Sequence, residues 1–399
     1  MTTRRQFLRG LSALAAAGCA PVAQVDAPVP AGVPLPTSNF GPTAPPGFHF
    51  RLTRDWGRPA QVIHEVRPAV VGTAHAPDPR APDPARLVRE AVEQAGGFER
   101  AVRSGDRVVL KLNLVSAMGS GTGFTTDVRV AEAVARLALD AGARRIVFAE
   151  GSATAPASGG MRNHYRPEAT QLAFERGGIR DLARRLGAEL LDLNEAGRGA
   201  FGRELVRKVR LAHGLQDSSY WLSKAFLDAD RVISVPVLKN HEYTGVTLAL
   251  KNWIGVAPAG VYHPPGARTG KWGLDHRMLP LARHIVDLVM ARPPDYVVMD
   301  ALVGINSGVT AYPFLPGPGG PMRAILAGAD PVAVDAVACL AMTYDPATIG
   351  HLVLAEAVGL GVADPVKITV RGAGIGPFRQ EYATPVNGMY VPGRWRRRM

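Results

Sequence analysis

Cysteine is nearly absent from this chain of 399 residues, which contains only Cys19 and Cys339. Two thiols cannot supply the ligands of an iron–sulfur cluster or of a cysteine-type zinc site, so we predict neither. A folded domain that begins after Cys19 also has no partner for a disulfide. Cys339 stands among small apolar residues, a setting typical of a buried structural thiol rather than a nucleophile.

A long apolar run is missing too, since none approaches the roughly 20 residues that cross a bilayer. The apolar stretch at residues 11–18 is short and follows the paired arginines Arg4 and Arg5. This combination is typical of a twin-arginine signal peptide, which we assign to residues 1–19. The sequence therefore predicts recognition by the twin-arginine export machinery, which carries folded proteins, and a periplasmic location.

The residues before Cys19 resemble the cleavage box of bacterial lipoproteins, although Ala16 stands where leucine is usual. Ordinary cleavage after the alanine run is the alternative. Residues 20–60 are rich in proline, as expected of a tether for an anchored domain. We therefore predict lipidation of Cys19 and a lipid anchor in the membrane.

The positive charge is mostly terminal, although the formal net charge is +12. Seven arginines lie near the two ends of the chain, and without them 39 basic residues face 34 acidic ones: Arg4, Arg5, Arg9, Arg394, Arg396, Arg397 and Arg398. No basic stripe with interleaved aromatic residues occurs, so we expect no nucleic-acid partner. The basic tail at residues 376–399 is either a solvated end or a contact for anionic lipid.

Several catalytic motifs are absent as well. The chain has no HExxH or HxxxH pair for zinc, no GxSxG elbow, no GxxxxGK[ST] phosphate loop and no strand-linked GxGxxG. The function must therefore rest on residues outside these patterns.

Strand-like and helix-like segments alternate from residue 61 onward, which predicts an α/β fold with a largely parallel sheet flanked by helices. Residues 61–375 form this domain, as one body or as two lobes. Residues 107–115, 125–142 and 144–151 read as strand, helix and strand, a crossover unit. Further strands are expected at 188–194, 231–238, 296–304, 323–328 and 366–372, and helices at 166–178, 278–291, 330–342 and 351–361. Long loops at 151–165, 257–277 and 306–320 are candidate binding loops.

Lysine is scarce, with only seven among 46 basic residues, so a lysine inside an apolar strand needs an explanation. Lys111 lies in such a strand, and Asn113 shares its face two residues later. Lys239 and His241 follow another apolar run and would share a face in an extended chain. Lys251 ends a third apolar segment.

A lysine can simply extend its ammonium from a strand end into solvent, which is the structural alternative for any one of them. Three together favour a shared anion-binding site, because an ammonium attracts phosphate or carboxylate and serves as a base when its pKa falls. We expect parallel strands to deliver these side chains to one cleft: Lys111, Asn113, Lys239, His241, Lys251 and Asn252.

Carboxylates stand near the same strand ends. Glu150 closes one strand and Asp300 lies near the end of another, where open α/β sheets bind ligands. Asp330 before Pro331 predicts a helix N-cap. Asp335 lies inside an apolar helix and needs a partner, which one of the lysines could be. Glu150, Asp300 and Asp335 are candidate ligands for a divalent metal, or hold the lysines in place.

Several segments, in this order and spacing, closely resemble a family of bacterial and archaeal domains of unknown function, DUF362. They are KLN at 111–113, the threonines 125 and 126, GARRIVFAEG at 142–151, residues 227–255, Asp300 and ADPVAVDAVA at 329–338. The resemblance covers roughly residues 65–375. Many members carry an added ferredoxin-type cysteine module, which this chain lacks.

The resemblance implies an architecture and a set of recurring residues rather than a reaction. Those positions are Lys111, Asn113, Thr126, Glu150, Lys239, His241, Thr247, Lys251, Asn252, Asp300, Asp330 and Asp335. We assign Lys239, His241 and Lys251 to catalysis, with His241 as general acid or base. Lys111, Asn113, Thr126, Thr247 and Asn252 are assigned to ligand binding.

The resulting hypothesis is an exported enzyme that acts on a small anionic substrate or cofactor. A lipid-anchored binding or assembly protein without catalysis is the alternative.

Overall fold

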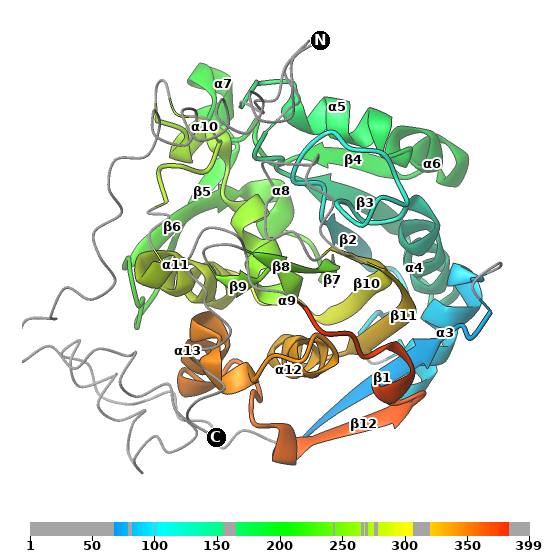
Figure 1. The fold of residues 1–399 in the computed structure, drawn as a ribbon. Helices are drawn as coiled ribbons and strands as arrows, with labels where there is room; N and C mark the ends of the chain where they lie inside the picture. Colours follow the sequence, from blue (N-terminus) through cyan, green and yellow to red (C-terminus); the bar gives the residue numbers. More distant parts are fainter. Residues whose placement is uncertain are drawn as a thin grey trace, which may run out of the picture. The chain divides into compact units, whose positions relative to one another are not determined.

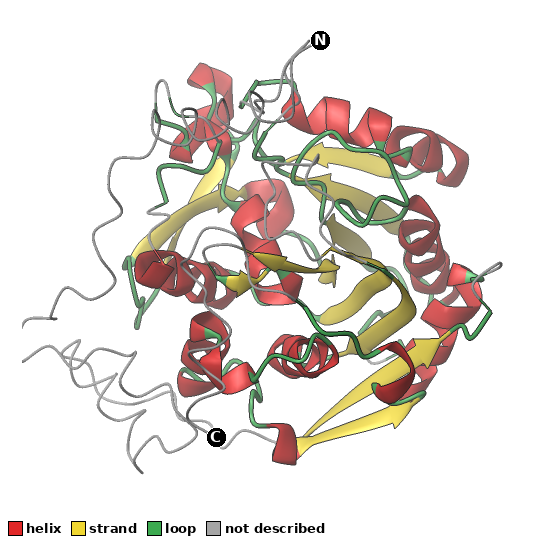
Figure 2. Ribbon diagram, viewed as in Figure 1, coloured by secondary structure: helices red, strands yellow, loops and turns green. Residues whose placement is uncertain are grey.

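A mostly parallel sheet runs through the middle of the described chain, with helices on both faces (Figures 1 and 2). The computed structural model describes residues 68–78, 82–99, 101–154, 165–241, 244–264, 267, 270–274, 278–305 and 320–382. All of them belong to one compact unit. The strand order is β12 (Ile368–Gly372), β1 (Ala69–His75), β11 (Pro321–Gly328), β10 (Tyr296–Ile305), β7 (Arg231–Val235), β2 (Arg107–Leu112), β3 (Arg145–Glu150) and β4 (Glu189–Asp192).

Strand β11 is antiparallel to both of its neighbours, and the other neighbouring pairs in this order are parallel. The carboxyl ends of β2, β3, β7 and β10 therefore meet at one edge of the sheet. Strand β8 (Val237–His241) pairs in parallel with β10 and antiparallel with the short β9 (Gly245–Val246). The predicted α/β fold with a largely parallel sheet is confirmed.

Two hydrophobic cores, one on each face, hold the helices to the sheet. The first face packs against α3 (Pro84–Gln94), α4 (Val128–Asp140), α5 (Ala169–Arg176) and α6 (Ile179–Leu186). The second packs against α9 (Leu248–Lys251), α11 (Met278–Ala291), α12 (Pro331–Ala341) and α13 (Gly350–Ala357). Shorter elements are α7 (Gly199–Glu204), β5 (Val206–Arg210), β6 (Ser219–Ser223), α8 (Lys224–Leu227), η2 (Asn252–Val256), α10 (Ala259–Tyr262), η3 (Pro346–Thr348), η4 (Pro365–Lys367) and η5 (Gly376–Phe378).

Strand alternation decides which face each β2 side chain takes. Val108, Leu110 and Leu112 enter the core under α3 and α4, whereas Val109 enters the core under α9 and α12. Lys111 has the parity of Val109 and therefore points to the face that carries α9.

The crossover unit predicted at residues 107–151 is present as β2, α4 and β3. The run predicted as one strand at 231–238 is instead two strands, β7 and β8, separated by Pro236. The carbonyl of Pro236 still accepts the amide of Asp300 from β10, at 2.8 Å. Proline has no N–H for a sheet, so the continuous run breaks there and β8 departs to pair with β9.

The expectation that a strand carries Lys251 and Asn252 was wrong. Lys251 ends the short helix α9 and Asn252 begins the 3₁₀ turn η2, so a helix rather than a strand carries both. The physical reason lies at Leu248, whose positive φ of 49° turns the chain out of an extended path.

The core extends beyond residue 375, where we expected the tail to begin, because Phe378 and Tyr382 pack into it. The predicted signal peptide, Cys19 and the tether lie outside the described residues, as do residues 155–164, 306–319 and the end of the basic tail. Among the described helices, none has the length and apolarity needed to cross a bilayer.

Candidate functional site

The amide of Asn252 lies where the strand order reverses direction, between β2 and β7. Its Nδ2 donates to the Lys111 carbonyl at 3.1 Å and to the Ser234 hydroxyl at 3.2 Å. Its Oδ1 accepts from Lys111 Nζ and from Asn113 Nδ2, both at 3.1 Å. Such a switch point is the usual ligand position in open α/β sheets, and Asn252 ties both strands to the segment that follows Lys251.

Asn113 connects this amide to the second lysine. Lys239 Nζ donates to Asn113 Oδ1 at 2.8 Å and to the Phe124 carbonyl at 2.9 Å. Burial, together with the positive charges of Lys251 and Lys111, lowers the pKa of Lys239 to about 7, against the opposing charge of Glu150. The structure therefore brings Lys111, Asn113, Lys239 and Asn252 together, and places Lys251 close enough to act on Lys239.

Lys111 is fully buried and forms an ion pair with Glu150, Nζ to Oε1 at 2.9 Å. Glu150 also accepts the amides of Leu114 at 2.6 Å and Gly151 at 2.7 Å. Burial lowers the pKa of Lys111, against the opposing charge of Glu150. This carboxylate is thus a structural counter-ion with most of its hydrogen-bonding capacity in use.

Thr126 positions Asn113 rather than offering a hydroxyl to a ligand. Its Oγ1 donates to the Val235 carbonyl at 2.7 Å and accepts the Asn113 amide at 2.8 Å. The amide of Thr126 in turn donates to the Asn113 carbonyl at 3.0 Å. The sequence assignment of Thr126 to ligand binding therefore stays a prediction that its hydrogen bonds do not favour.

Asp335 holds the segment that carries Lys251. Its carboxylate accepts the amides of Ala249 at 2.7 Å and Leu250 at 2.9 Å, just after the strained Leu248. The sequence indicates that Asp335 needs a partner, for which a lysine is one candidate, and the structure supplies two backbone amides. Burial raises the pKa of this carboxyl well above its ordinary value.

The predicted N-cap at Asp330 is confirmed. Its Oδ1 accepts the amides of Val332 and Ala333, both at 2.9 Å, and Pro331 is the first residue of α12. Its Oδ2 accepts the amide of Val362 at 3.0 Å.

Lys271 is a third buried lysine that the sequence analysis did not place in the site. Its Nζ donates to Asn194 Oδ1 at 2.5 Å and to the carbonyl of Ala257. Burial lowers its pKa to about 7, and the charges of Glu150 and Lys111 also act on it. The scarcity of lysine was a usable signal here, since it applied to Lys271 as well as to the others.

Gly151 and Gly255 leave room for Lys111 and Lys271 in the same region, because neither glycine has a side chain. A Cβ at residue 255 would collide with Glu150 Oε1 and fall 2.7 Å from Lys111 Nζ. A Cβ at residue 151 would collide with the Gly255 carbonyl and fall 2.9 Å from Lys271 Nζ. The close contact of Gly151 and Gly255 thus brings Lys111 and Lys271 to the same buried region.

Two buried polar groups beside the lysines have no hydrogen-bond partner. The Thr247 hydroxyl is one, and the amide of this residue donates to the Lys239 carbonyl at 2.9 Å. Both ring nitrogens of His351 on α13 are the other. Burial lowers the pKa of His351 to about 3, and the charge of Lys251 lowers it too. His351 was missed from the sequence, where its only signal was a histidine in an otherwise apolar helix.

The unpartnered nitrogens of His351 are expected to lower the stability of the ligand-free protein. His351→Leu should raise the unfolding free energy of the ligand-free protein by about 1–3 kcal/mol, because it removes unsatisfied buried polar groups. Urea denaturation measures this. His284→Leu is the matched control and should destabilise, since His284 Nδ1 lies 2.7 Å from the Tyr220 hydroxyl. A loss of stability in His351→Leu would contradict the prediction.

The three carboxylates suggested as metal ligands do not gather. Glu150 pairs with Lys111, and Asp335 lies in α12 against α9. Asp300 accepts the amides of Asp127 at 2.8 Å and Leu302 at 3.0 Å, next to the N-terminus of α4 on the opposite face of the sheet. Burial raises the pKa of Asp300 to about 7. Among the described residues, no group of three His, Cys, Asp or Glu side chains could hold a metal ion.

His241 ends β8 and is buried, two residues after Lys239 on the same strand. The free thiol of Cys339 is buried in α12, and burial raises its pKa well above the ordinary value. The structural assignment of Cys339 is thereby confirmed.

A family model matches residues 108–340, which include β2, β3, β7, β8, α9 and α12. The chain belongs to the family described as Domain of unknown function (DUF362). The match contains every lysine of the site, whereas His351 of this DUF362 chain lies beyond it.

Relatives of the DUF362 chain include a thylakoid-associated protein of Synechocystis sp., 27% identical over 279 residues, which are 68% of this chain and 74% of the relative. Among solved structures, the lactate racemase apoprotein of Thermoanaerobacterium thermosaccharolyticum is 13% identical with a TM-score of 0.34, covering 66% of this chain and 55% of that one. A Thermotoga maritima protein is 14% identical with a TM-score of 0.29, covering 56% and 52%. The chain thus spans about half of each of these two structures.

Proposed function

We propose that this DUF362 chain is an enzyme that acts on a small anionic molecule, bearing phosphate or carboxylate, bound at the buried lysines. One observation carries the proposal. Lys111, Lys239 and Lys271 are each buried, and the charge of Lys111 acts on the other two. Of these three lysines, only Lys111 has a carboxylate within ion-pair distance among the described residues.

The imbalance of charge favours an anionic ligand. Among the described residues, Lys239 and Lys271 donate to amide and carbonyl oxygens and to no carboxylate. A buried ammonium without a counter-charge is costly, and the protein relieves part of that cost by lowering the pKa of both lysines to about 7. An anion beside either lysine would supply the missing charge.

The same lysines can take part in proton transfer. A group with a pKa of about 7 exchanges protons readily at neutral pH, which suits Lys239 to general acid–base chemistry. His241 shares a strand face with Lys239 by alternation and is proposed as its partner in acid–base catalysis. Lys251 contributes a further positive charge, and the amides of Asn113 and Asn252 hold Lys239 and Lys111 in position for the anion.

The test is a ligand screen by thermal stability, using phosphorylated metabolites, nucleotides, hydroxy acids and simple carboxylates. A ligand at 100 times its dissociation constant should add roughly 2.7 kcal/mol of stability. Lys251→Ala should abolish that gain, and Lys367→Ala, which removes an exposed lysine, should leave it unchanged. If no anion stabilises the protein, or if Lys251→Ala keeps the full gain, the proposal fails.

Anion affinity is expected to fall as the pH rises above 7. Lys239 of the ligand-free protein loses its proton at about that pH, and an anion binds the protonated form. Affinity should therefore be constant below pH 7 and drop up to tenfold per pH unit above it for each lysine that must be charged. Calorimetric titration from pH 6 to 9 measures the slope, which Lys239→Gln should reduce. An affinity independent of pH would refute this role.

A binding protein without catalysis is the second candidate. It is favoured by the use of Glu150, Asp300 and Asp335 for backbone amides, which leaves mainly cations and amides for a ligand. His241→Gln separates the two functions. In an enzyme it should nearly abolish turnover of the identified ligand while most of the binding remains. Binding with no chemistry on any bound compound, in wild type and variant alike, would support the binding protein.

We further propose that the chain is exported by the twin-arginine route and anchored through Cys19. The signal-like residues 1–19 support this, and the Synechocystis relative is described as thylakoid-associated, which fits a membrane-linked location. Mass spectrometry of the mature N-terminus should find an acylated Cys19. An unmodified terminus that begins at Gly18 would contradict the anchor.

A further inference from the structure

The hairpin of β5 and β6 has one polar and basic face. In its antiparallel register Lys208 pairs with Trp221 and Arg210 pairs with Ser219, so these four side chains share one side. Lys208, Arg210 and Trp221 are exposed. Tyr220 and Leu222 take the opposite side and are fully buried.

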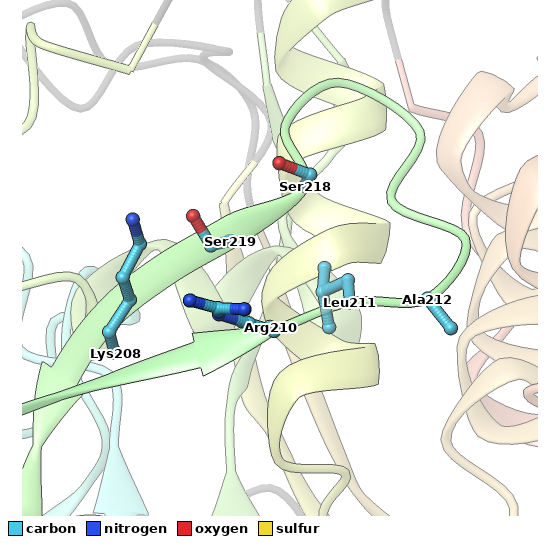
Figure 3. Close-up of a pocket in the computed structure, with 6 residues that line it drawn as sticks. All are labelled: Lys208, Arg210, Leu211, Ala212, Ser218 and Ser219. Carbon is cyan, nitrogen blue, oxygen red and sulfur yellow. The ribbon is translucent and has the colours of Figure 1, made fainter.

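A cavity of about 510 Å³ opens beside this face. Its lining consists of two strand cations, two hydroxyls and two apolar residues of the connection: Lys208, Arg210, Ser218, Ser219, Leu211 and Ala212. Figure 3 shows these side chains on the two strands and on the connection between them. No acidic side chain lines the cavity. Two cations and two hydroxyls form a donor set that suits a phosphate group.

Hydrogen bonds to α11 hold the connection between β5 and β6. Asp287 on α11 accepts the amides of Leu215 at 2.5 Å, Gln216 at 2.8 Å and Asp217 at 3.0 Å. The Tyr220 hydroxyl donates to the same carboxylate at 2.9 Å. The nearby Asp217 carboxylate lies 3.6 Å from His284 Nδ1, on the α11 side. These contacts fix the basic face as a preformed surface.

Exposed apolar side chains lie on the basic face and on the segment that precedes β5. Trp221 is 41% exposed, and Lys208 Nζ lies 5.8 Å from the centre of its ring. Phe201 on the adjoining α7 is 88% exposed, and Leu205 between α7 and β5 is also exposed. Aromatic side chains beside lysine and arginine are the pattern of surfaces that lie in the headgroup region of a bilayer.

We propose that the β5–β6 hairpin docks on an anionic phospholipid surface, with a lipid phosphate in the cavity between Lys208 and Arg210. Trp221 and Phe201 enter the interfacial region beside it. Trp221 beside Lys208 favours a lipid over a free phosphate, because a soluble anion has no use for an exposed apolar group next to its site. This surface is independent of the buried lysine site and of the anchor at Cys19.

Vesicle sedimentation tests the proposal with the full chain carrying Cys19→Ser, which removes acylation as a cause of binding. The chain should bind phosphatidylcholine vesicles that contain about one third phosphatidylglycerol, and bind pure phosphatidylcholine much less. Lys208→Gln with Arg210→Gln should weaken partition about 30-fold, since two charges near such a surface contribute about 1 kcal/mol each. Trp221→Ala should weaken it several-fold.

The matched control is Arg184→Gln with Arg185→Gln, which removes two exposed charges from α6 and should leave partition within about twofold. Equal loss in the control and the hairpin variant would overturn the proposal, because it would show a general effect of charge. Absence of vesicle binding would also overturn it. Binding of inorganic phosphate that depends on Lys208, without partition into vesicles, would replace the lipid surface with a soluble-anion site.

Discussion

Glu150→Gln is expected to lower the free energy of unfolding by about 3–5 kcal/mol, because it leaves the charge of Lys111 buried without its partner. The pair is closed, with Nζ and Oε1 2.9 Å apart and both side chains buried. Reversible chemical denaturation at neutral pH measures the effect.

The double variant Lys111→Met with Glu150→Gln should recover most of that loss, because removing both charges removes the penalty of an isolated one. Glu90→Gln is the surface control. It opens an exposed ion pair with Arg86 and should change stability by less than about 1 kcal/mol. A double variant no more stable than Glu150→Gln alone would mean that the amides of Leu114 and Gly151, rather than the ion pair, depend on this carboxylate.

Asp335→Ala should lower the free energy of unfolding by about 2–6 kcal/mol, since two buried amides lose their acceptor at roughly 1–3 kcal/mol each. Those amides follow Leu248, whose φ of 49° is unfavourable for a branched apolar residue. Without the carboxylate this turn should relax and move Lys251. Anion affinity should therefore fall together with stability, although Asp335 itself does not touch the ligand.

Asp364→Ala provides the comparison, because Asp364 caps the short turn η4 through the Val366 amide at 3.0 Å. It should cost about 0.5–2 kcal/mol and leave anion affinity unchanged. If Asp335→Ala lowers stability as expected but keeps wild-type affinity, Asp335 supports the fold without positioning Lys251.

The features that local sequence could predict are those set by neighbours along the chain. Alternation within β2 was enough to place Lys111 and Asn113 on one face, and both indeed bond to Asn252. The N-cap at Asp330 followed from Asp before Pro. The crossover of β2, α4 and β3 followed from periodicity and a glycine stop.

Contacts between residues far apart in the sequence could not be predicted from the sequence. Nothing near Asp335 in the chain indicates that its partners are the amides of Ala249 and Leu250, 86 and 85 residues away. Lys271 is held in the site by its hydrogen bond to Asn194, and the charge of Lys251 lowers the pKa of His351 on a different helix. Such contacts depend on the assembled sheet and helices.

The position of β1 bears on when this domain can fold. Strand β1 at Ala69–His75 pairs with β11 at Pro321–Gly328 and with β12 at Ile368–Gly372, so both of its neighbours are made late in synthesis. A nascent chain therefore holds an apolar strand with two open edges until nearly the whole domain has left the ribosome. Closure of the sheet around β1 therefore waits until residues 321–372 have been made, and it must precede the folded-protein export proposed above.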